Sequence, residues 1–66
     1  MKITYQGKQV ETSATTVAAF LSEADVDCGR AIVEYDGGLY APGSDLSAVA
    51  LKPDAVLDVF KIAAGG

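Results

Sequence analysis

Alternation of polar and apolar residues predicts two short strands at the start of the chain. Residues 2–5 (KITY) alternate and are rich in β-forming side chains, and residues 9–12 (QVET) alternate again. A period of two is typical of strands with one buried face. Because Gln6-Gly7-Lys8 separates the two runs, we expect a β-hairpin.

A helical spacing follows this predicted hairpin. Four apolar residues fall at i, i+3, i+4 and i+7, namely Val17, Phe20, Leu21 and Ala24. This spacing places them on one face of a helix, which is expected to pack on the core. The hydroxyl side chains among residues 13–16 are candidate N-caps.

The middle of the chain predicts a second hairpin. Residues 31–35 (AIVEY) form an apolar run that ends at Asp36-Gly37, a sequence strongly associated with tight hairpin turns. Residues 39–40 are expected to pair back, and the tyrosines at 5, 35 and 40 to pack across strands. After Ala41-Pro42-Gly43, residues 44–46 are predicted to start a short helical turn.

The last predicted strand, residues 56–62 (VLDVFKI), carries large apolar side chains at both parities. Such a strand either lies in a sheet covered on both faces or is covered on one face only. A single helix covers one face of a small sheet. We therefore favour the second interpretation, in which one apolar face awaits a partner.

Length and charge narrow the function classes. A chain of 66 residues forms one thin core, with no room for an enclosed active site. The formal net charge of −4 would repel a nucleic-acid backbone. A protein partner with a basic face is the better electrostatic match.

The small number of reactive side chains also limits the kinds of site that the chain can form. Cys28 is the one cysteine and histidine is absent, so neither an internal disulfide nor a transition-metal site is expected. Cys28 itself is interpreted as a small, partly buried filler. The apolar runs are too short to cross a bilayer, and the N-terminus lacks the pattern of a signal peptide. We expect a cytoplasmic protein without nucleic-acid or membrane partners.

The segment Ala63-Ala64-Gly65-Gly66 is the most informative one, because no side chain in it is larger than methyl. Four extended residues reach about 13 Å, so this tail can enter a narrow channel in another protein. The reacting group would be the Gly66 carboxylate, a poor electrophile that needs activation. The alternative is an inert, frayed end. We divide the chain into a folded domain, residues 1–62, and a flexible tail, residues 63–66.

These elements together resemble the ubiquitin-like sulfur carrier proteins of the ThiS and MoaD type. The resemblance covers the whole chain and rests on the opening Lys-Ile-Thr strand, the helix at 16–21, the turn at 33–37, the Ala41-Pro42 step and the closing strand into Gly65-Gly66. The resemblance implies an α+β β-grasp fold, a mixed sheet of four to five strands packed on one helix. It also implies that the last strand lies in mid-sheet beside the first.

The same resemblance implies a protein co-substrate rather than an enzyme. An E1-like adenylyltransferase of the ThiF or MoeB type, using ATP and magnesium, would adenylate Gly66, and the carrier itself would bind no cofactor. Sulfur from a cysteine desulfurase would then convert Gly66 to a thiocarboxylate. A thiazole synthase of the thiamine pathway is the expected acceptor, and the free carrier is expected to be monomeric.

Several alternatives stay open at this point. The sulfur could serve molybdopterin, cysteine or homocysteine, or tRNA thiolation, and the chain could instead be a ubiquitin-like protein modifier or a plain binding module. Phe60, Ile62 and residues Ala63, Ala64 and Gly65 are expected to contact the partner. Alternatively, Phe60 and Ile62 belong to the core while Leu57 and Val59 face outward, or both pairs are buried.

Overall fold

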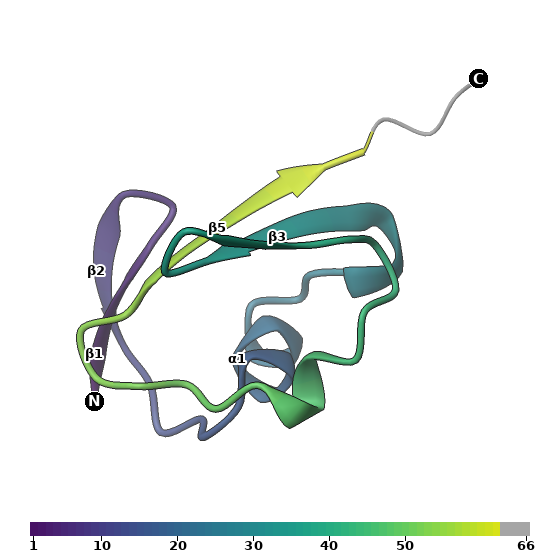
Figure 1. The fold of residues 1–66 in the computed structure, drawn as a ribbon. Helices are drawn as coiled ribbons and strands as arrows, with labels where there is room; N and C mark the ends of the chain where they lie inside the picture. Colours follow the sequence, from purple (N-terminus) through teal and green to yellow (C-terminus); the bar gives the residue numbers. More distant parts are fainter. Residues whose placement is uncertain (63–66) are drawn as a thin grey trace.

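The computed structural model describes residues 1–62, and these form one mixed sheet packed on one α-helix (Figure 1). The elements are β1 (Lys2–Tyr5), β2 (Lys8–Glu11), α1 (Val17–Glu23), β3 (Ala31–Tyr35), β4 (Gly38–Tyr40) and β5 (Val56–Lys61), with 3₁₀ turns at Cys28–Arg30 and Leu46–Ala48. The strand order is β2-β1-β5-β3-β4. Strand β5 runs parallel to β1 and antiparallel to β3. The expected β-grasp fold, with the last strand in mid-sheet beside the first, is confirmed.

Both predicted hairpins are present, and each closes through a two-residue turn. The central residues have positive φ in both turns, at +51° and +79° for Gln6 and Gly7 and at +47° and +87° for Asp36 and Gly37. Two consecutive positive φ values define the type I′ turn, whose twist matches that of paired strands. Glycine at the second position adopts this conformation without steric cost.

Helix α1 begins where the hydroxyl pattern predicts. Thr16 is the N-cap, and its Oγ1 accepts a hydrogen bond of 3.1 Å from the backbone N–H of Ala19. Val17, Phe20 and Leu21 are buried against the sheet. The fourth member of the predicted stripe, Ala24, is the C-cap and is half-buried.

The core lies between α1 and one face of the sheet. Its largest fully buried side chains are Ile3, Leu21, Leu57, Val17 and Val33. Tyr5 packs edge-to-face on Phe20, with ring centroids 5.0 Å apart. The ring of Tyr5, which the sequence predicts to pack across strands, thus also contacts the helix. Burial also raises the pKa of the Tyr5 phenol.

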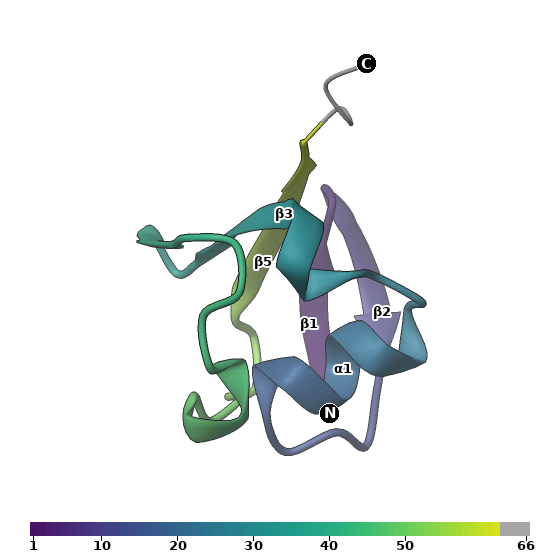
Figure 2. The ribbon, with the colours of Figure 1, turned by 90° about the vertical axis from the view of Figure 1, so that its right-hand side faces the viewer.

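The long connection from β4 to β5 is fastened on the same side of the sheet as α1 (Figure 2). Asp45 caps the predicted turn by accepting a hydrogen bond from the backbone N–H of Ser47, and the buried Leu46 anchors it to the core. The hydrogen bond from the Ser47 hydroxyl lowers the pKa of Asp45, and the bond from this N–H lowers it further by a smaller amount. From the sheet, the Tyr35 hydroxyl donates to the carbonyl of Ala50 at 2.8 Å.

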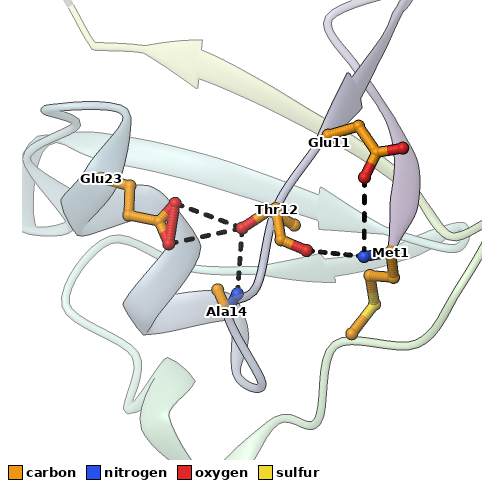
Figure 3. A network of polar contacts seen from close by, with 5 residues as sticks. All are labelled: Met1, Glu11, Thr12, Ala14 and Glu23. Carbon is orange, nitrogen blue, oxygen red and sulfur yellow. Dashed lines mark hydrogen bonds and ion pairs between the residues drawn. The ribbon is translucent and has the colours of Figure 1, made fainter.

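A buried threonine joins the first hairpin to the helix (Figure 3). The Thr12 Oγ1 accepts a hydrogen bond of 3.0 Å from the N–H of Ala14 and donates to the Glu23 carboxylate at 3.2 Å. The Thr12 carbonyl also accepts a bond from the Met1 amine at 2.8 Å. The Thr12 side chain is thus hydrogen-bonded both to the connecting loop and to the last turn of α1.

We expect Thr12→Val to lower the free energy of unfolding by about 1–3 kcal/mol, because it leaves the buried N–H of Ala14 without an acceptor. Urea denaturation measures this change. Thr15→Val, at an exposed position, is the control and should change stability by less than about 0.5 kcal/mol. Equal effects of the two substitutions would contradict a bonding role for Thr12.

Candidate functional site

The two faces of β5 differ sharply, and the difference places the predicted docking residues. Leu57 and Val59 point into the core, with 0% and 6% of their surface exposed. Phe60 and Ile62 are 53% and 49% exposed. Of the alternatives for this strand, the structure therefore has Phe60 and Ile62 facing outward. Among residues 1–62, the sheet is covered on one face only, as we favoured from the two-sided apolar pattern of β5.

Neighbouring strands extend this exposed surface. Ile32 on β3 lies opposite Phe60, Glu34 lies opposite Asp58, and Leu39 on β4 lies opposite Glu34. Leu39 is 70% exposed. We call this surface the outer face; it comprises Val56, Asp58, Phe60 and Ile62 with Ile32, Glu34 and Leu39. In the part of the chain that the structure describes, α1 and the long connection both lie on the opposite side of the sheet (Figures 1 and 2).

A pair of carboxylates lies within this apolar surface. Glu34 and Asp58 are directly opposite each other on β3 and β5, and both are half-buried. Within residues 1–62, neither forms an ion pair with a lysine or arginine. Like charges directly opposite each other destabilise a sheet. The outer face therefore offers a negative spot surrounded by apolar groups.

A shallow hollow of about 290 Å³ lies at the end of β5. It is lined by Asp25, Val26, Asp27, Arg30, Lys61 and Ile62. The backbone N–H of Ile62 donates to the carbonyl of Arg30 at 2.9 Å, so this bond still holds the end of the strand to the sheet. The Arg30 guanidinium lies 3.7 Å from the Asp27 carboxylate, an exposed ion pair of little energetic weight.

Two turn residues that sequence reasoning missed hold β5 from opposite edges. The Gln6 carboxamide forms two hydrogen bonds with the backbone of Val59, at 2.8 and 3.0 Å. The Asp36 carboxylate accepts a bond of 2.8 Å from the N–H of Val56. The turns themselves are readable from the sequence, but nothing in the pattern reveals that their side chains reach the last strand.

The remaining predicted residues contribute differently. Ala63, Ala64, Gly65 and Gly66 lie outside the described residues, so their roles stay predictions. Cys28 is half-buried and packs against the core. Residues 1–62 contain no group of three side chains arranged to hold a metal ion. Among the described helices, none is long and apolar enough to cross a membrane.

Comparison with known proteins identifies the fold. No protein-family model matches the chain, and no curated protein matches its sequence. Among solved structures, the chain is similar to the thiamine biosynthesis protein ThiS from Geobacter metallireducens, with a TM-score of 0.79 over the full length of both chains. Sequence identity is 21%. The likeness shows that the chain has the β-grasp fold of that protein.

Shortening a side chain to alanine should cost more stability on the inner face of β5 than on its outer face. Leu57→Ala removes a fully buried side chain and should cost about 2–5 kcal/mol of unfolding free energy. Phe60→Ala removes a half-exposed one and should cost less than about 1 kcal/mol. Chemical denaturation of both variants measures the contrast, and a larger loss for Phe60→Ala would contradict its outward placement.

Proposed function

We propose that this protein is a sulfur carrier, a co-substrate whose C-terminal glycine is activated and then loaded with sulfur. The observation that carries the proposal is the mid-sheet position of β5. This strand leads into Ala63-Ala64-Gly65-Gly66, within a fold that matches a thiamine biosynthesis protein along its full length. By this likeness, the thiazole of thiamine is the proposed destination of the sulfur.

The chemistry needs nothing from the side chains of the carrier. The Gly66 carboxylate attacks the α-phosphate of ATP on an E1-like adenylyltransferase, giving an acyl adenylate and pyrophosphate. A persulfide sulfur, drawn from cysteine by a desulfurase, then expels AMP and forms an acyl disulfide. A thiol reductant cleaves the S–S bond and leaves the thiocarboxylate. A thioacid is ionised at neutral pH, so its sulfur is nucleophilic without a base on the carrier.

The activating enzyme supplies the magnesium and the groups that stabilise the phosphates during adenylation. The carrier is proposed to bind no cofactor of its own, to act in the cytoplasm and to be monomeric when free. A thiazole synthase is the proposed sulfur acceptor. Recognition of the folded domain lets each partner select the carrier before it receives the reactive end.

The outer face is the proposed docking surface for the adenylyltransferase. Phe60 and Ile62 lie next to the start of the tail and are half-exposed, which suits contact with an apolar partner surface. The Glu34 and Asp58 carboxylates lack a cation among residues 1–62, so a partner arginine or lysine would relieve their repulsion. Docking here would direct residues 63–66 toward the partner.

Removal of Gly66 tests the acyl-transfer chemistry. We expect the untagged protein to support ATP–pyrophosphate exchange by an E1-like adenylyltransferase, and the variant lacking Gly66 to abolish it. Gly66→Ala keeps a carboxylate but adds a methyl group, and should reduce kcat/KM at least about tenfold if the channel is narrow. Undiminished exchange without Gly66 would contradict the proposal. Stable attachment of the chain to lysines of other proteins would indicate a protein modifier instead.

The facing carboxylates of Glu34 and Asp58 give a second test, in which one substitution should improve stability and weaken partner binding. Asp58→Asn should raise the free energy of unfolding by a few tenths of a kcal/mol, roughly, because it removes a like-charge contact. The same substitution should raise the KM for the carrier in adenylation about threefold or more, because the partner cation loses its counter-charge. Asp54→Asn, at an exposed turn, is the control. An unchanged KM in the Asp58 variant would argue against docking at this pair.

A further inference from the structure

The Gln6 side chain takes the place of a missing strand residue. Its Oε1 accepts a hydrogen bond of 2.8 Å from the N–H of Val59, and its Nε2 donates to the carbonyl of Val59 at 3.0 Å. These bonds are partly buried and join residues 53 positions apart in the chain. A carboxamide presents the same donor and acceptor as a peptide group. Gln6 therefore pairs with β5 as a neighbouring strand would.

The Gln6 side chain can fill this position because β1 ends before it reaches Val59. The backbone N–H groups of Thr4 and Gln6 donate to the carbonyls of Ala55 and Leu57, at 2.8 and 3.1 Å. The type I′ turn then diverts the chain into β2. Residues of a strand face its two edges alternately, so Val59 is the next residue of β5 on the β1 side. Without the Gln6 side chain, this edge would be open from Val59 onward.

The second hairpin provides a counterpart on the other edge. The Asp36 Oδ1 accepts a bond from the N–H of Val56, and the Asp36 N–H donates to the carbonyl of Val56 at 2.9 Å. Each type I′ turn thus contributes its first central residue to β5. Asp36 holds the beginning of the strand, whereas Gln6 holds the part next to the C-terminal segment.

We propose that Gln6 is a positioning residue for the end of β5. By pairing with Val59 on the edge opposite β3, it fixes the course of Phe60, Lys61 and Ile62, which pair with β3 and Arg30 on the other edge. The outer face then already has its binding conformation before a partner docks. If the binding-competent arrangement were populated only in part, apparent affinity would fall by that fraction. The effect on the partner rests on the proposed function, whereas the effect on Val59 does not.

A matched pair of glycine variants separates this role from general destabilisation. Gln6→Gly and Asp36→Gly each remove one side chain from a position of positive φ, which glycine adopts freely. We expect Gln6→Gly to lower the hydrogen-exchange protection of the Val59 amide about tenfold or more, and to spare Val56. Asp36→Gly should do the reverse. Unchanged Val59 protection in Gln6→Gly overturns the proposal.

A pH profile adds a signature that loss of packing cannot give. In Gln6→Glu, a protonated carboxyl retains one donor and one acceptor, whereas the carboxylate sets a charged oxygen against the Val59 carbonyl oxygen. The repulsion between these two oxygens should push the side chain away from Val59 and weaken its bond to the Val59 N–H as well. Protection of Val59 should therefore recover as pH falls through the titration of the new carboxyl. The charged residues of the surrounding strands are Lys2 on β1, Lys8 and Glu11 on β2, Glu34 on β3, and Asp58 and Lys61 on β5. The wild type controls for their titration because it carries them all. A profile identical to the wild type overturns the proposal.

The effect of Gln6 on the partner is tested by the kinetics of adenylation by the activating enzyme. Gln6→Gly should raise the KM for the carrier about five- to tenfold with kcat unchanged, whereas Asp36→Gly should leave KM within about twofold of the wild type. Equal increases in the two variants overturn the positioning role, because they indicate general destabilisation. If even the wild type is not adenylated, the proposed function fails, and the Val59 exchange data then decide the role of Gln6.

Discussion

The structure depends on the hydrogen bonds that β5 makes along both of its edges, while among residues 1–62 only one of its faces is covered. Strand β1 pairs with it over two residues and β3 over five, and the turns at Gln6 and Asp36 supply side-chain hydrogen bonds where these pairings end. Leu57 and Val59 bind it to the core beneath. A strand fixed in this way can expose apolar side chains on its other face without losing its conformation.

This arrangement fits a protein that acts through its chain end. Residues 1–62 provide a mid-sheet strand that leads in sequence to residues 63–66, beside a surface of apolar side chains and two carboxylates that have no ion-pair partner among the described residues. Under the proposed function, the chemistry at the chain end is left to partners that recognise the folded domain.

Much of the fold is predictable from the sequence because local signals agree with one another. The Asp36-Gly37 turn, the stripe of Val17, Phe20 and Leu21, and the two-sided apolar pattern of β5 each indicate the element that forms. The pattern could not decide which parity of β5 faces outward, because both carry large apolar groups. Nor could it reveal the bonds from Gln6 and Asp36, since contacts between residues 53 and 20 positions apart depend on the assembled sheet. Tyr5 illustrates the same limit: alternation places its ring on the inner face, but the helix position determines that it meets Phe20.

The central claim is that the C-terminal glycine of this chain carries sulfur. Intact mass spectrometry of the untagged protein, purified from the cells that make it, tests this most directly when followed by fragmentation of the C-terminal peptide. The account predicts a species heavier by the difference between one sulfur and one oxygen atom, located at Gly66 and removed by alkylation and hydrolysis. A carboxylate form that stays unchanged after incubation with ATP, cysteine and extract of the same cells would contradict it.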